Sequence, residues 1–175
     1  MNFRMKRTIV IFLSAVVVLG GIFLYVRASN TPPGEKKLVE SFHAHRTDYE
    51  RLRDMLQADE QLVRVASSGV ETTESPVMHI PPEGGFPTSR YNDYLVLIKQ
   101  IGGISAFRRR GEHPEVGIGM WASGWAGNTR HVEICWLDQE PTNQTHSLDD
   151  YYLTPKPRSP VFRHIDGNWY LWADW

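Results

Sequence analysis

The chain has 175 residues, enough for one domain of ordinary size, and carries 19 Lys and Arg against 20 Asp and Glu. All of the acidic residues and all but four of the basic ones follow residue 27, so the larger part of the chain is mildly acidic. Because a nucleic-acid binder needs a basic surplus to neutralise phosphates, nucleic acid is not an expected partner.

Residues 8–26 form a stretch of 19 uncharged, mostly apolar residues. As a helix this stretch spans about 28 Å, which matches the hydrocarbon core of a bilayer. Three basic residues precede it and one follows it, namely Arg4, Lys6, Arg7 and Arg27. By the positive-inside rule the N-terminus stays in the cytoplasm and the rest of the chain crosses the membrane.

The sequence therefore predicts a single-pass protein of the cell membrane, whose C-terminal domain lies in the periplasm if the source is bacterial. A cleaved signal peptide is the competing interpretation, but the apolar stretch is longer than usual and Arg27 is unfavourable at a cleavage site. The predicted parts are a basic cytoplasmic tail, a transmembrane anchor, a proline-containing linker and an extracytoplasmic domain, at residues 1–7, 8–26, 27–34 and 35–175.

Apolar spacing predicts two helices in the domain. The first covers residues 35–58, where apolar side chains recur at helical intervals, and the second runs from a cap at Thr88 or Ser89 to residue 101, before two glycines. Between them we expect a strand at 62–66 and a long loop at 67–87, with residues 77–80 as a further strand candidate. The apolar stripe of the first helix consists of Leu38, Phe42, Tyr49, Leu52 and Leu56.

Strand patterns dominate the second half of the chain. Short β-prone runs occupy residues 104–108, 116–122 and 131–137, with a glycine-rich turn expected at 123–130. A long connection at 138–160, with one helical turn after Ser147, leads to a hairpin of residues 161–165 and 168–173 around Asp166-Gly167. The predicted fold class is α+β, with two helices packed on an antiparallel meander. The closing hairpin is similar to the last hairpin of cystatin-like rolls, a resemblance that implies no function.

The most suggestive polar cluster is His131, Glu133 and Cys135, which alternate along one predicted strand and so share a face. His131 and Cys135 lie about 13 Å apart on such a strand, which rules out a cysteine nucleophile with His131 as its base. His131 and Glu133 could form half of an acid–base or metal site with Asp174 or Asp166. The alternative is the polar face of a half-exposed strand, with Cys135 as an apolar filler.

The remaining histidines give no metal signature. His43 and His45 point to nearly opposite sides of the predicted first helix, where His45 falls on the apolar stripe as a core residue or the floor of a pocket. No histidine or cysteine spacing matches a zinc site, so the sequence predicts no metal site and no cofactor. With one cysteine in the chain, no intrachain disulfide can form.

The glycine-rich turn supplies the ligand-binding candidates. Small residues between two tryptophans allow close approach of a ligand to the backbone, and polar groups follow them. The alternative is a simple turn with both tryptophans packed in the core. The candidate ligand-binding residues are Trp121, Trp125, Asn128 and Arg130.

Three functional hypotheses follow from these patterns. The first is a membrane-tethered, non-enzymatic domain that binds a protein or cell-envelope ligand. The second is a metal-assisted hydrolase that uses His131 and Glu133 with Asp174 or His164. The third is a structural subunit that assembles through its membrane helix and an aromatic edge.

Overall fold

A computed structural model describes residues 18–21, 30–109, 115–125, 128–154 and 159–174. The chain divides into two units, Met1–Pro32 and Pro33–Trp175. In the first unit residues 18–21 are helical, while the rest of the predicted anchor, the basic tail and the possible cleavage site lie outside the described residues. Within the described ranges, no helix has both the length and the apolar character needed to span a bilayer.

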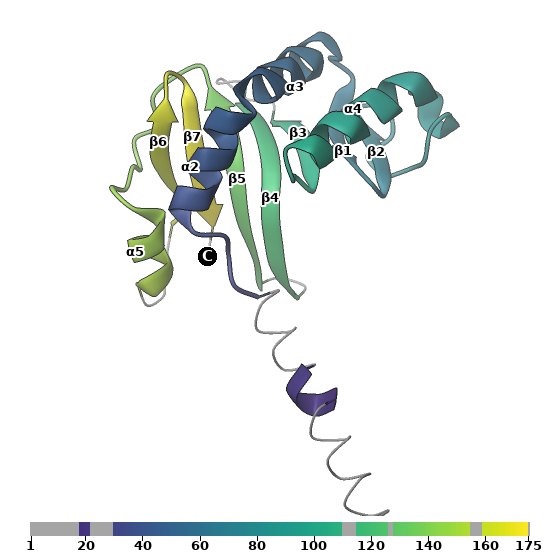
Figure 1. Cartoon of the computed structure of the whole chain (residues 1–175). Coiled ribbons are helices and arrows are strands. Elements are labelled where there is room, and N and C mark those ends of the chain that lie inside the picture. Colours follow the sequence, from purple (N-terminus) through teal and green to yellow (C-terminus); the bar gives the residue numbers. More distant parts are fainter. Residues whose placement is uncertain (1–17, 22–29, 110–114, 126–127, 155–158, 175) are drawn as a thin grey trace, which may run out of the picture. The chain divides into compact units, whose positions relative to one another are not determined.

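The second unit is built on one seven-stranded antiparallel sheet, which confirms the α+β class (Figure 1). The strands follow the order β2-β1-β3-β4-β5-β7-β6 across the sheet, with every neighbouring pair antiparallel. Their bounds are Leu62–Ala66 for β1, Gly69–Thr72 for β2, Ser105–Arg109 for β3, Glu115–Trp125 for β4, Asn128–Leu137 for β5, Val161–Asp166 for β6 and Trp169–Asp174 for β7.

The expected meander is correct for β3, β4 and β5 but not for the last hairpin. There β7, the later strand, pairs with β5, and β6 forms the sheet edge. Burial explains this order, because residues 169–173 of β7 are all buried whereas β6 is half-buried to exposed. The more apolar strand therefore takes the interior position.

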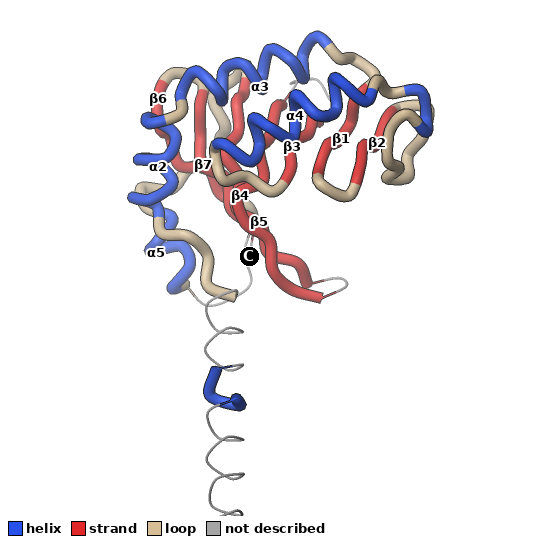
Figure 2. Tube along the Cα trace, turned by 45° about the vertical axis from the view of Figure 1, so that its right-hand side comes forward, coloured by secondary structure: helices blue, strands red, loops and turns tan. Residues whose placement is uncertain are grey.

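Three helices pack on one face of this sheet (Figures 1 and 2). They are α2 at Glu35–Ala44, α3 at Arg46–Ala58 and α4 at Thr88–Gln100. Their buried side chains form one core with residues of the strands, among them Val65, Ile118, Ile134 and Leu171. All five residues of the predicted apolar stripe belong to this core, as expected.

The prediction of one continuous helix over residues 35–58 is wrong. His45, with φ −122° and ψ 24°, separates α2 from α3. In an unbroken helix Phe42 and Tyr49 would lie about 10 Å apart along the axis, but their ring centroids are 5.4 Å apart. Both rings also contact Trp169 of β7, at 5.4 and 6.0 Å. The break thus gathers three aromatic rings in the core, while the side-chain spacing alone does not reveal it.

The predicted end of α4 and the predicted turn after Ser147 are confirmed, but the predicted cap of α4 is not. α4 ends as expected, because Gly102 adopts φ +70° and the Gly103 N–H donates to the Ile98 carbonyl at 2.9 Å. Its N-cap is Pro87, without a side-chain cap, so neither Thr88 nor Ser89 takes that role. The single helical turn predicted after Ser147 is α5, at Leu148–Leu153, and the Ser147 hydroxyl accepts the Asp150 N–H at 3.2 Å.

The expected loop at 67–87 contains a strand that the sequence analysis missed. Residues 69–72 form β2 and pair with β1 as a hairpin. The strand candidate at 77–80 contributes one isolated bridge, between His79 and Val70. A four-residue strand that includes a glycine is too short to stand out from loop composition.

We predict that Gly117→Ala destabilises the domain by about 2 kcal/mol or more, because the new methyl group would overlap the Phe107 ring on the neighbouring strand. Chemical denaturation measures the change. Gly34→Ala is the matched control, since its nearest neighbour would be Asp149 Oδ1 at an ordinary 3.7 Å. Equal stability of the two variants would contradict the close packing of Phe107 on Gly117.

Candidate functional site

The face of the sheet opposite the helices, called here the open face, carries two rows of aligned side chains. Directly paired residues of neighbouring strands project from the same side of a sheet. One row joins seven strands, through Glu71, Arg64, Phe107, Gly117, Cys135, Tyr170 and His164. The next row contains Ser105, Gly119, Glu133, Trp172 and Phe162. In both rows β4 contributes glycine; the Phe107 ring lies over Gly117, and the face is low beside Gly119.

This low area is a cavity of about 360 Å³. Polar side chains from four strands line it, together with apolar groups at its margins, a composition found in many small-ligand sites. The polar lining includes Arg64, Glu71, Ser105, Arg109, His131 and Glu133, and the apolar lining includes Val63, Ile104, Phe107 and Trp121.

Arg109 of β3 holds the polar groups of the cavity in place. One guanidinium nitrogen lies 2.5 Å from Glu115 Oε1, and another lies 3.2 Å from Glu133 Oε2. The guanidinium carbon also lies 4.8 Å from the ring centres of both Phe107 and Trp172. Arg109 therefore combines two ion pairs with two cation–π contacts, and this fixes the Glu133 carboxylate on the cavity wall.

Burial changes the protonation chemistry of the site. It raises the pKa of Glu133 to about 7, although the positive charge of Arg109 opposes the shift. Burial also raises the pKa of Glu115 and lowers that of His131, in the latter case against the attraction of Asp174. Burial thus favours the uncharged form of His131, and near neutral pH Glu133 is partly protonated.

The two predicted catalytic residues do meet at this site. His131 and Glu133 line the same cavity. Asp174 pairs with His131 across the strands β5 and β7, whereas Asp166 forms an ion pair with Arg46 on the helix side. His164 lies at the outer strand β6, where its Nε2 is 2.9 Å from the Gly167 carbonyl, and it does not line the cavity. The structure thus does not bring Asp166 or His164 to the candidate pair.

Cys135 and the two helix histidines have structural positions. Cys135 is fully buried, its Sγ donates to the Tyr170 carbonyl at 3.5 Å, and burial raises its pKa well above the ordinary value. His45 is not on a buried stripe but at the helix break, half-exposed, with Nδ1 3.4 Å from Asp48 Oδ2. His43 is exposed. In the part of the chain that the structure describes, no three His, Cys, Asp or Glu side chains are grouped to hold a metal ion.

The predicted glycine-rich turn at 123–130 is mostly strand. β4 continues to Trp125 and β5 begins at Asn128, and these two residues pair. The side chains of Trp125 and Asn128 lie outside the described residues. Trp121, beside a bulge in β4, lines the cavity, while Arg130 pairs with Ser123 beyond it. Of the four predicted ligand-binding residues, one is thus placed at the cavity.

Apart from Trp121 of β4, the cavity residues outside β5 were not among the predicted site residues. Arg64, Ser105 and Arg109 lie on β1 and β3, which are distant from His131 in the sequence. The alternation of Gly117 and Gly119 in a predicted strand was the available signal, because small residues there lower one face of the sheet. To predict the residues of β1 and β3 at the cavity, one must also know which strands flank β4, and the sequence does not show the strand order.

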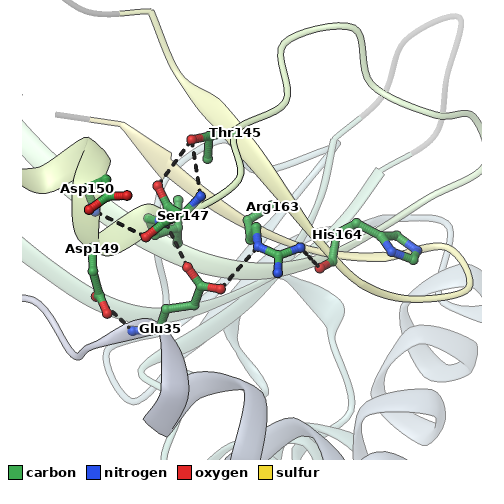
Figure 3. A network of polar contacts seen from close by, with 8 residues as sticks. Glu35, Thr145, Ser147, Asp149, Asp150, Arg163 and His164 are labelled. Carbon is green, nitrogen blue, oxygen red and sulfur yellow. Dashed lines mark hydrogen bonds and ion pairs between the residues drawn. The ribbon is translucent and has the colours of Figure 1, made fainter.

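A second polar network joins the beginnings of α2 and α5 (Figure 3). The Glu35 carboxylate accepts the Leu148 N–H at 2.8 Å and Arg163 Nε–H at 3.1 Å. In return Asp149 Oδ1 accepts the Glu35 N–H at 3.0 Å. Each helix thus receives a carboxylate from the other at its N-terminus, where N–H groups otherwise lack partners. Because these groups bind one another, this network is structural.

Comparison of the chain with protein-family models, with curated proteins and with solved structures finds no match.

We predict that the stability of the wild-type domain falls relative to Glu133→Gln as pH rises from about 4.5 to 8. The folded-state pKa of Glu133, about 7, lies above the ordinary 4.5, so the folded state binds the proton more tightly than the unfolded state. The resulting stabilisation is complete below pH 4.5 and is lost by the time the pH passes 7, a change on the order of 3 kcal/mol.

Denaturant unfolding of both proteins at a series of pH values gives this difference. Glu115 is present in both, so its own titration largely cancels. A constant difference between the two proteins across this range would show that the carboxyl group of Glu133 has an ordinary pKa.

Proposed function

We propose that this chain is a single-pass membrane protein that presents a non-enzymatic binding domain on the far side of the membrane. Residues 8–26 are the anchor, the N-terminus is cytoplasmic, and the domain of residues 35–175 binds a protein or cell-envelope ligand. The support for the anchor is the apolar stretch and the basic residues before it. In a bacterium the domain is periplasmic.

The observation that carries the binding proposal is the cavity on the open face. Its polar groups come from β1, β2, β3 and β5, so a ligand there is held by a rigid sheet and not by loops. The helices occupy the other face and close the main core. On the open face Cys135, Tyr170 and Trp172 are buried in a second small core, and the cavity beside β1 and β3 combines charged and apolar groups that a ligand can reach.

The contacts of the cavity favour binding over catalysis. Glu133 is engaged by Arg109, at 3.2 Å, and does not stand free to attack or to accept a proton from a substrate without breaking that pair. Ser105 is the hydroxyl group in the lining, yet among the described residues no hydrogen bond joins it to His131. A nucleophile and its base require such a contact.

A hydrolase is the second candidate, because one observation favours it. His131 and Glu133 line one cavity, and the pKa of Glu133 near 7 suits a general acid or base at neutral pH. A metal ion would need further ligands from outside this pair. This candidate predicts turnover of simple ester, amide or phosphoester substrates, with and without added Zn²⁺, that is lost in His131→Ala. Absence of turnover above buffer under both conditions would count against it.

For the anchor, we predict that the full chain sediments with membranes and resists extraction by alkaline carbonate. A variant without residues 1–27 should be recovered in the soluble fraction, since it lacks the apolar stretch. The intact mass of the membrane-bound protein distinguishes a retained anchor from a cleaved signal peptide. A soluble full-length chain, or a mass lacking the first 27 residues, would contradict the proposal.

For the binding site, we predict that Arg64→Ala and Trp121→Ala each reduce capture of the natural ligand from an envelope extract by at least tenfold, by loss of a charged contact and an apolar wall. The matched control is Arg51→Ala, which removes an exposed arginine from α3 on the helix side. Quantitative mass spectrometry of the captured material measures the effect. Equal capture by all three variants would place the binding site elsewhere.

A further inference from the structure

The charged groups of the cavity differ in whether they already have partners. Arg109 is bound to Glu115 and Glu133, and it lies between two aromatic rings. Arg64, by contrast, has no hydrogen bond or ion pair with any residue in the described ranges. Glu71 is its partner in strand register, but no ion pair within 4.0 Å joins them. Of the two arginines on β1 and β3 that strand alternation directs to the open face, Arg64 is therefore the one without a partner among the described residues.

The position of Arg64 directs its charge into the cavity. Its positive charge lowers the pKa of both His131 and Glu133, which lie on β5, three positions from β1 in the sheet. Arg64 lines the same cavity as these two residues. Arg64 thus supplies a planar, permanently charged fork of donors at one side of this space.

The balance of charge limits the ligand that this fork can accept. Arg64 and Arg109 contribute two positive charges to the open face of the cavity, Glu71 contributes a negative one, and Glu133, with a pKa of about 7, is only partly ionised at neutral pH. Arg108 also borders the cavity, but alternation along β3 directs its side chain to the helix side. A single negative charge is matched by Arg64, whereas the second charge of a doubly charged group would have no unpaired cation on the open face, because Arg109 is already bound to Glu115 and Glu133.

The apolar residues at the margin of the cavity indicate what the rest of the ligand is. Ile104, which is 47% exposed, and Trp121 and Val63 border the cavity near its polar groups. These side chains can cover an apolar substituent, and a volume of about 360 Å³ is at the small end of ligand sites.

We propose that the cavity binds a monocarboxylate with an adjoining apolar group, the carboxylate paired with Arg64 and the apolar group against Ile104 and Trp121. A small free acid and the C-terminal residue of a peptide or protein both have this chemistry. The proposal rests on the proposed binding function and names the ligand class of the same site.

The test uses the full chain in detergent micelles and measures binding by calorimetry. The probes are N-acetyl-Ala-Leu with a free carboxylate, the same dipeptide as its C-terminal amide, isovalerate and inorganic phosphate. The expected result is that the free dipeptide binds at least tenfold more tightly than its amide. Comparable binding of isovalerate would identify a small free acid as sufficient, and binding of the dipeptide alone would indicate a peptide terminus.

Two variants separate failure of the ligand class from failure of the site. Arg64→Ala should weaken binding of the carboxylate at least tenfold, and Arg51→Ala should leave it unchanged. If the amide binds as tightly as the acid, or phosphate binds more tightly than both, the carboxylate assignment is overturned. If Trp121→Ala nevertheless abolishes that binding, the cavity remains the binding site. If no probe binds at 10 mM, roughly the weak limit of specific recognition, the ligand class is overturned. The proposed binding function is then decided by capture from the envelope extract alone.

Discussion

The open face of the sheet depends on Arg109. Two partly buried carboxylates, Glu115 and Glu133, share its guanidinium group, and two aromatic rings enclose it. Without this cation, two like charges would lie close together with little water to solvate them, which is among the costlier arrangements in a folded protein. Burial raises the pKa of Glu133, so the ionised form of this carboxyl group depends on the positive charge of Arg109. The chemistry of the cavity and the packing of the open face therefore have a common origin.

Glycine in the central strand makes this arrangement possible. Gly117 accommodates the Phe107 ring, and at Gly119 a Cβ atom would lie 2.6 Å from the Ser105 hydroxyl. A strand without side chains at these two positions loses some β-propensity. Here the loss is offset by partners on both sides, because β4 is held between β3 and β5 at residues 115–119, which include both glycines. The glycines of β4 thus stand where this strand pairs on both sides, and the cavity lies beside one of them, Gly119.

Local patterns in the sequence predicted most helices and strands, but they did not predict which of these elements lie side by side. The apolar stripe of α2 and α3, the Asp-Gly hairpin and the helical turn after Ser147 were all predicted, since each depends on residues within a few positions of one another. The helix break at His45 and the order of β6 and β7 were not, because both are decided by contacts with Trp169 and by burial of β7. At the site, alternation along β5 placed His131 and Glu133 on one face, but Arg64 and Arg109 could not be added without knowing the strand order.

The reciprocal caps of α2 and α5 have a consequence for how the domain forms. Glu35 and Asp149 are 114 residues apart, and β7, which completes the packing around Phe42, comes later still. Contacts between such distant residues form slowly, because the intervening chain must be ordered first. During synthesis α2 therefore emerges long before Asp149, whose carboxylate caps the N-terminus of that helix. Both caps, and the packing of Phe42 on Trp169, therefore form only when nearly the whole domain is present.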